Sequence, residues 1–211
     1  MITLGIIGVV AAMTLPTLIQ NHEEKATVTK LKKMYSTLQN AYNLYLAEDN
    51  PIVIPEYDEA GAVTVANLFL PYLNVAKDCG NTINDNCLYN GTYRYKNGNS
   101  AVNYVSSAKY YKIILNDGST IWFRGTEGSN PFGEIFYDVN GKNPPNQWGY
   151  DLFDFFIQKD PNRIVPVGVG DLPDNFNSTC APENSTGWGC AYWVIQQENM
   201  KYLKDHNLTL N

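Results

Sequence analysis

Histidine is scarce in this 211-residue chain, and no familiar catalytic motif accompanies it. The two histidines, His22 and His206, lie near opposite ends of the sequence. They provide little material for a histidine-rich metal site or for a nucleophile activated by a histidine base. The sequence also contains no glycine-rich phosphate loop, nucleophile elbow or metal-binding helix motif. We therefore expect that the protein is not an enzyme.

Charged residues are also few, and they are mostly acidic. Only 17% of residues are charged, with 15 Lys and Arg against 21 Asp and Glu, so the formal net charge is −6. This balance argues against a nucleic-acid partner bound by simple electrostatics. Hydrophobic residues make up 44% of the chain and aromatic residues 13%, which is too apolar for a disordered protein.

The four cysteines form two local pairs, Cys79 with Cys87 and Cys180 with Cys190. Neither spacing is the C-x-x-C of redox or zinc sites, so disulfides formed outside the cytoplasm are the favoured interpretation. Four cysteines allow three connectivities, and the short loops favour the two local pairs, each stabilising by roughly 2–3 kcal/mol. Four buried free thiols in a cytosolic protein remain the alternative.

Residues 1–19 form a long hydrophobic run without an ionisable side chain. As a helix they would span about 28 Å, close to the hydrocarbon thickness of a bilayer. The alternatives are a cleaved signal peptide and a buried core helix. The first lacks a preceding Lys or Arg, and the second lacks other segments apolar enough to surround it. We expect a segment that crosses a membrane or is buried between subunits.

Two glycines and one proline in this segment should affect its packing and its shape. Gly5 and Gly8 have the spacing that allows close approach of another helix, and Pro16 should bend the helix without ending it. The residues expected to serve membrane insertion and assembly are Ile2, Leu4, Gly5, Ile6, Ile7, Gly8, Val9, Val10 and Pro16.

Residues 20–50 show a second helical pattern, with one apolar stripe and charged residues elsewhere. The stripe advances in steps of three and four residues through Val28, Leu31, Tyr35, Leu38, Tyr42 and Tyr45. It is too short for a long coiled coil, so we expect it to dock on a domain of the same chain. Asn50 and Pro51 should end the helix. A continuous helix over residues 2–48 would be about 70 Å long.

Residues 51–211 are expected to form a globular head. Residues 59–76 have the pattern of a helix interrupted near Pro71, and residues 160–184 that of a loop. Strand patterns with intervening turns occupy 92–96, 101–105, 110–115, 120–125, 133–139 and 151–157, with Asp117-Gly118 as the strongest hairpin signal. The aromatic residues expected in the core or on the sheet surface are Tyr111, Trp122, Phe136, Phe153 and Phe155. The fold class predicted is α+β, with a long N-terminal helix packed on an antiparallel sheet.

The loop from Asp138 to Asp151 contains candidate calcium ligands. Asp138, Asn140, Asn146 and Asp151 supply oxygen atoms around Gly141, and calcium prefers six to eight oxygen ligands. The alternative, which the sequence favours, is an Asn-Gly turn followed by a proline-stiffened connection. No other cofactor is expected.

The run ITLGIIGVVAAMTLPTLIQNHEEKATVTKLKKMYSTLQNAY resembles the N-terminal helix of type IV pilins and type II secretion pseudopilins. Pro16 falls where that family places a helix-bending proline. The segments FYDVNGKNPPNQWGYDLFDFFI and GWGCAYWVIQQENMKYL also resemble heads of bacterial prepilin-type proteins. The resemblance implies a pilin-like fold and a structural role as a minor pilin or pseudopilin.

The resemblance also implies a location and a set of partners. The chain would be held in the bacterial inner membrane by residues 1–19, with its head in the periplasm or on the cell surface, until it enters a filament. Its partners would be membrane lipid, an inner-membrane assembly platform and other pilin subunits contacted through the N-terminal helix. Some pseudopilins bind calcium in a C-terminal loop. In pilin-like heads the disulfide-bounded C-terminal region tends to lie on the exposed filament surface, which makes it a candidate contact surface here.

One departure from the family pattern concerns the start of the chain. The family begins with a basic leader and a Gly before the cleaved bond, followed by Phe and, four residues later, Glu. None of these is present, so we expect that the sequence is truncated or that its start codon is misassigned. We therefore expect that a prepilin peptidase does not process the chain as written.

A membrane-tethered binding module is the second hypothesis from the sequence. Its head would capture a glycan, a secreted protein or DNA at the cell surface. Aromatic residues expected in loops would serve this role, namely Tyr89, Trp148, Tyr150 and Trp188. Such aromatic residues more often pack beneath loops.

Overall fold

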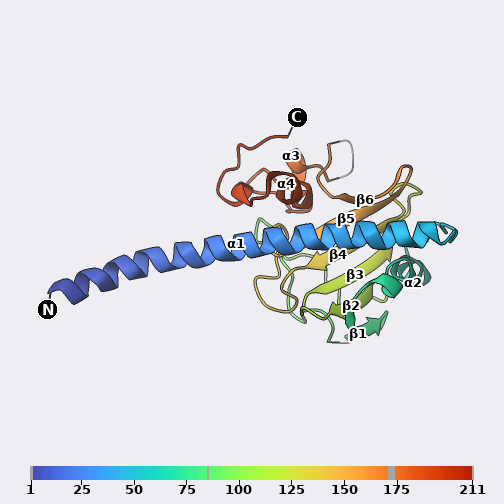
Figure 1. Ribbon diagram of the computed structural model, residues 1–211, viewed down its shortest axis with the longest axis horizontal. Coiled ribbons are helices and arrows are strands. Elements are labelled where there is room, and N and C mark those ends of the chain that lie inside the picture. The colour runs from blue at the N-terminus through green and yellow to red at the C-terminus, as the bar shows by residue number, and fades with distance from the viewer. Residues whose placement is uncertain (1, 85, 171–173, 211) are drawn as a thin grey trace.

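A long helix and an antiparallel sheet make up the fold, which confirms the α+β class. The computed structural model describes residues 2–84, 86–170 and 174–210, and within them all side chains except those of residues 2–13 and 17. Helix α1 (Ile2–Ala47) lies across the sheet, and its N-terminal part extends beyond the head (Figure 1). The six strands follow the order β1-β2-β3-β4-β5-β6, so each pairs with its neighbour along the chain.

The elements after α1 are short. The strands are β1 (Val75–Gly80), β2 (Tyr111–Leu115), β3 (Thr120–Gly125), β4 (Gly133–Asp138), β5 (Leu152–Lys159) and β6 (Asn162–Pro166). The helices are α2 (Glu59–Asn67), α3 (Phe176–Thr179) and α4 (Cys190–Gln197), with 3₁₀ turns η1 (Leu70–Tyr72) and η2 (Lys201–Leu203).

The apolar stripe of α1 packs on one face of the sheet, as predicted. Leu31, Leu38 and Tyr42 are fully buried there, and the ring of Tyr35 stacks on Phe155 at 6.0 Å between centroids. The helix also covers a strand edge, because Gln39 Oε1 accepts a hydrogen bond from the backbone N–H of Ile164 in β6 (3.0 Å). The second half of α1 is thus an integral part of the head.

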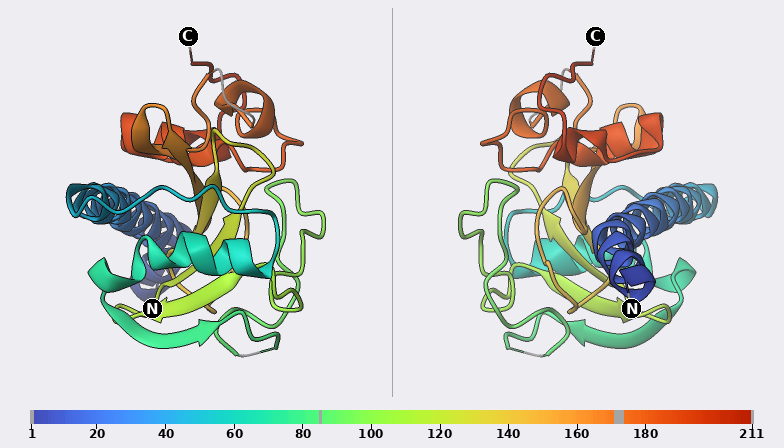
Figure 2. Two further views of the ribbon diagram at one scale, coloured as in Figure 1. Left: turned by 90° about the vertical axis from the view of Figure 1, so that its right-hand side faces the viewer. Right: turned by 90° about the vertical axis from the view of Figure 1, so that its left-hand side faces the viewer.

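The opposite face of the sheet carries a second, aromatic core. Residues alternate along β3, so that Ile121 and Phe123 pack toward α1 while Trp122 packs on the other side. The connection between β1 and β2 covers this second face (Figure 2). There the ring of Tyr104 contacts Trp122 at 5.1 Å and Phe136 at 5.5 Å. The head is therefore a sheet between two apolar layers.

The predictions of strands at 92–96 and 101–105 are wrong. Within the described residues this segment has only isolated bridges, such as Arg94 with Ser100, and no regular strand. Its alternating aromatic residues instead insert into the second core, where Tyr93 and Tyr104 are almost fully buried. The period-two pattern reflects burial against an existing sheet rather than pairing within it.

The sequence analysis did not predict either edge strand, β1 or β6. Strand β1 begins within the segment predicted as helix (59–76), where α2 ends at Asn67, and β6 lies within the predicted loop (160–184). Both strands are short and partly exposed at the sheet edges, where turn and charged residues replace the apolar pattern. The central hairpins β2-β3 and β4-β5 were predicted close to their observed bounds.

Candidate functional site

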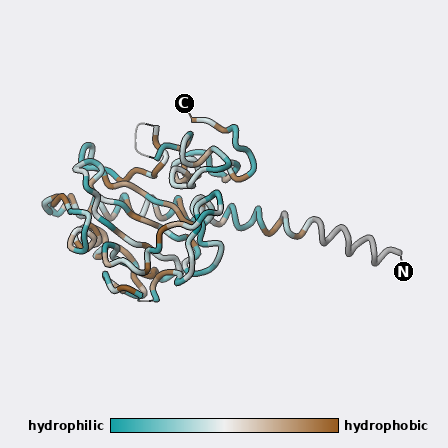
Figure 3. Tube along the Cα trace, turned by 180° about the vertical axis from the view of Figure 1, so that it is seen from behind, coloured by the Kyte–Doolittle hydropathy of each residue, from teal (hydrophilic) through white to brown (hydrophobic). Residues whose placement is uncertain are grey.

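The N-terminal half of α1 leaves the head with its described side chains uncovered. Every described residue from 14 to 23 is exposed, and Leu15, Leu18 and Ile19 are 55%, 65% and 52% exposed. The helix continues through Pro16, as predicted. Figure 3 shows this part of the helix projecting away from the sheet. Large apolar side chains on a projecting helix indicate a surface that is covered by something else.

The predicted assembly residues Ile2, Leu4, Gly5, Ile6, Ile7, Gly8, Val9 and Val10 have side chains outside those described. In the described part of the chain, no helical stretch combines the length and the apolarity needed to cross a bilayer.

The C-terminal region docks on α1 just beyond this projecting part. Lys204 Nζ forms an ion pair with Glu24 Oε1 at 2.8 Å, and Lys32 pairs with Glu198. Exposed ion pairs of this kind each contribute at most about 1 kcal/mol. They show that the head holds α1 from Glu24 onward.

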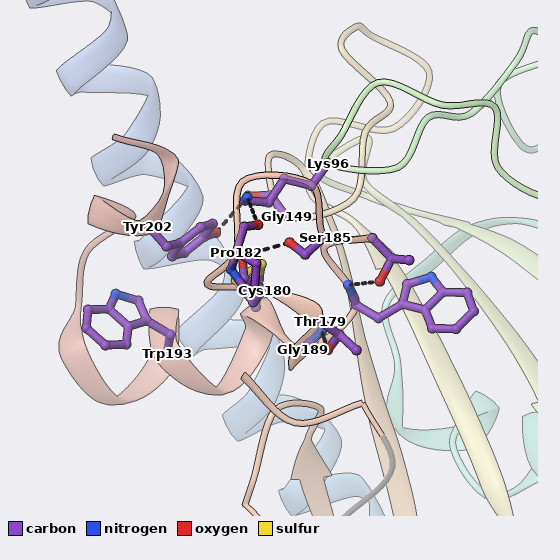
Figure 4. The surroundings of a disulfide bond; sticks show 12 residues. Lys96, Gly149, Thr179, Cys180, Pro182, Ser185, Gly189, Trp193 and Tyr202 are labelled. Atoms are coloured by element: carbon purple, nitrogen blue, oxygen red, sulfur yellow. Dashed lines mark hydrogen bonds between the residues drawn. A yellow bond between two sulfur atoms is a disulfide. The ribbon is translucent and has the colours of Figure 1, made fainter. Parts of the chain in front are cut away.

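Two disulfides confirm the predicted local pairing. Cys79 bonds to Cys87 and Cys180 bonds to Cys190. Figure 4 shows the second pair within a network of hydrogen bonds. Ser185 Oγ donates to the carbonyl of Cys180 (2.9 Å), and the N–H of Gly189 donates to Thr179 Oγ1 (3.0 Å).

Contacts to more distant segments complete the surroundings of this disulfide (Figure 4). Lys96 Nζ donates to the carbonyl of Pro182 (2.9 Å), and Tyr202 donates its hydroxyl to the carbonyl of Gly149 (2.7 Å). The C-terminal region is thereby joined both to the β1-β2 connection and to the β4-β5 loop. The C-terminal region is therefore an ordered part of the head surface.

The four candidate calcium residues meet in the β4-β5 loop. The two carboxylate oxygens of Asp151 accept hydrogen bonds from the backbone N–H groups of Asn146 (2.8 Å) and Gln147 (2.7 Å). Asp138 Oδ1 accepts one from the N–H of Asn140 (3.3 Å). Asp151 therefore closes the loop as a structural residue, in agreement with the turn alternative.

Three oxygen atoms of the same loop remain without a described partner. These are Asp138 Oδ2, Asn140 Oδ1 and Asn146 Oδ1, all shielded from solvent. Burial raises the pKa of Asp138 well above its usual range, and the nearby Asp151 raises it further. Burial also raises the pKa of Asp151 to about 6, although its backbone N–H partners act in the opposite direction. Among the described residues, no group of three or more His, Cys, Asp or Glu side chains forms a metal site.

A cavity of about 400 Å³ lies on the face of the sheet away from α1. Its lining includes the aromatic residues Tyr57, Tyr104, Tyr110, Phe136 and Trp188. It also includes the charged side chains of Arg124, Glu134 and Asp174. Cavities of this size and mixed lining are typical of small-molecule sites.

The floor of the cavity is an ion pair between adjacent strands. Arg124 on β3 lies directly opposite Glu134 on β4 and forms a salt bridge with it. Asp154 on β5, 2% exposed, lies beside Glu134, and its Oδ1 has no described hydrogen-bond partner. Burial and the neighbouring Glu134 raise the pKa of Asp154 well above its usual range.

The sequence analysis predicted one aromatic residue of the cavity lining but none of its charged residues. Of the four aromatic residues proposed for ligand binding, Trp188 lines the cavity, whereas Trp148 is buried in the aromatic core beneath the loops. Tyr89 packs at the edge of that core, and Tyr150 lines a different depression beside α1. Arg124 and Glu134 stand out only in that they interrupt otherwise apolar strands. No match to this chain emerges from comparison with known protein families, curated proteins and solved structures.

Proposed function

We propose that this protein is a structural subunit of a type IV pilus or type II secretion filament, anchored in the bacterial inner membrane before assembly. The observation that carries the proposal is the division of α1. From Val28 onward its apolar stripe is buried by the head, whereas Leu15, Leu18 and Ile19 project uncovered. The preceding residues extend this apolar character without one ionisable side chain.

The physical argument concerns what can cover such a helix. Lipid tails and the apolar helices of neighbouring subunits are equivalent surroundings for it, so a subunit can leave the bilayer without exposing its helix to water. Transfer between the two requires external work but no catalytic group in this chain. The head, held to α1 by its sheet, would then face the outside of the filament.

The test places a lysine in the apolar half of α1. We expect Val10→Lys in the full chain to reduce recovery in bacterial membranes and in filaments about 100-fold, because a charge in the bilayer centre costs about 2.5–3.5 kcal/mol. Membrane fractionation and electron microscopy of the assembling strain measure the effect. The control is Leu44→Lys at a 52% exposed position of the same helix, which should behave as wild type. A wild-type protein that is soluble and monomeric contradicts the proposal.

A second role, calcium binding by the β4-β5 loop, is favoured by its three unpartnered oxygens. Asp138, Asn140 and Asn146 would supply the ligands, and calcium would neutralise the repulsion between Asp138 and Asp151. We expect millimolar calcium to raise the unfolding temperature of the EDTA-treated protein, and equimolar magnesium to have little effect. Asp138→Asn should remove the shift, whereas Asp160→Asn at an exposed position should retain it. An unchanged unfolding temperature would contradict calcium binding by this loop.

A further inference from the structure

The cavity on the second face of the sheet has a combination of groups that neither filament assembly nor packing requires. Glu134 and Asp154 are charged residues buried in central strands, where apolar residues would be more stabilising. Arg124 and Asp174 are only partly buried and border open space within the cavity. This arrangement presents hydrogen-bonding groups to a cavity with largely aromatic walls.

The charges of the cavity argue against a charged ligand. The Arg124 guanidinium already lies over the rings of Tyr57 and Phe136, with its Cζ 5.2 and 5.3 Å from their centroids. Lys109 Nζ lies 4.2 Å from the Tyr57 centroid. An added cation would find these cation–π positions filled and would be repelled by Arg124. An added anion would meet Glu134 and Asp174.

A neutral ligand that both donates and accepts hydrogen bonds fits the remaining groups. The Asp174 carboxylate is partly exposed at the cavity, where it can accept hydrogen bonds. The Arg124 side chain, 28% exposed, retains N–H groups beyond those that bind Glu134. Sugar hydroxyls match such donors and acceptors, and the C–H faces of a sugar ring pack on aromatic side chains.

We infer that this cavity binds one end of a neutral saccharide. Trp188, the partly buried aromatic residue of the lining whose ring carries no cation, packs against the sugar ring, and Asp174 and Arg124 hydrogen bond to its hydroxyls. Glu134 and Asp154 orient Arg124 from below. The site belongs to the head alone, so the inference stands independently of the filament proposal.

The experiment uses the full chain in detergent and a set of neutral trisaccharides, namely maltotriose, cellotriose, mannotriose and N-acetylchitotriose. Titration calorimetry and ligand-observed NMR at millimolar concentration measure binding. Lysine methyl ester and sialyllactose serve as cationic and anionic comparison probes. We expect saturable binding of at least one neutral trisaccharide in preference to both charged probes.

Variants locate the site. Trp188→Ala and Asp174→Asn should each weaken binding about tenfold, since each removes a direct contact. Tyr150→Ala and Asp160→Asn, at comparable residues outside the cavity, should bind as wild type. Unfolding temperatures show whether each variant is folded. The inference is overturned if none of the neutral trisaccharides binds, if a charged probe is preferred, or if the cavity variants bind as well as their controls.

Discussion

Replacing Leu38 by alanine is expected to destabilise the head by about 2–5 kcal/mol, the range for removing a fully buried leucine. Leu38 is 0% exposed and sits at the centre of the stripe by which α1 packs on the sheet. The void left by the removed side chain would lie between a helix and a sheet, and neither element can shift easily to fill it. Chemical denaturation in detergent, followed by tryptophan fluorescence, measures the change because three of the four tryptophans lie in the head core.

The comparison variant is Leu44→Ala, on the same helix and with the same change in side chain. Leu44 is 52% exposed, so its truncation should change the free energy of unfolding by no more than about 0.5 kcal/mol. Equal losses for the two variants would show that α1 does not pack on the sheet through Leu38. In that event the division of α1 into a covered half and a free half would also fail.

Removal of the second disulfide is expected to cost about 3 kcal/mol, or about 6–12 °C in unfolding temperature. Cys180 and Cys190 are separated by 10 positions and both are 0% exposed, so Cys180→Ala with Cys190→Ala leaves no new buried polar group. Cys190 is also the first residue of α4, which packs against α1. Loss of the bond should therefore increase hydrogen exchange throughout α4.

The first disulfide is the natural control. Cys79 and Cys87 are separated by 8 positions, so their removal has a similar expected cost in chain entropy. It should leave hydrogen exchange in α4 unchanged, because this bond joins the edge strand β1 to the loop that follows. If removing either bond increased exchange in α4 equally, the second disulfide would have no local role in holding the C-terminal region.

Local patterns were sufficient to predict the helix and the central hairpins. The stripe through Leu31, Leu38 and Tyr42 has helical spacing, and the Asp117-Gly118 turn requires a residue with positive φ, which Gly118 adopts at 83°. The disulfides were predictable for the same reason, since their cysteines lie close together in the sequence. Each of these features depends on residues within one short segment.

The cavity depends instead on residues brought together from distant segments. Tyr57 precedes α2, Arg124 and Glu134 lie on central strands, and Asp174 and Trp188 belong to the C-terminal region. The β1-β2 connection, which contributes Tyr104 to the lining, has a strand-like sequence pattern. The reason is that Tyr93 and Tyr104 each lie among alternating polar residues. Only the completed sheet shows that these rings pack against Trp122 from above. The sequence offers no local signal for such an arrangement.

The short distance between Ile19 and Glu24 has a mechanical consequence. Five residues of continuous helix advance only about 7.5 Å, so no flexible tether separates the apolar segment from the first ion pair with the head. Under the proposed membrane anchoring, the head would therefore not rotate freely relative to the anchoring segment. The tilt of the helix would then dictate the direction in which the head presents its surfaces, and every copy in an ordered array would point the same surface outward at regular intervals.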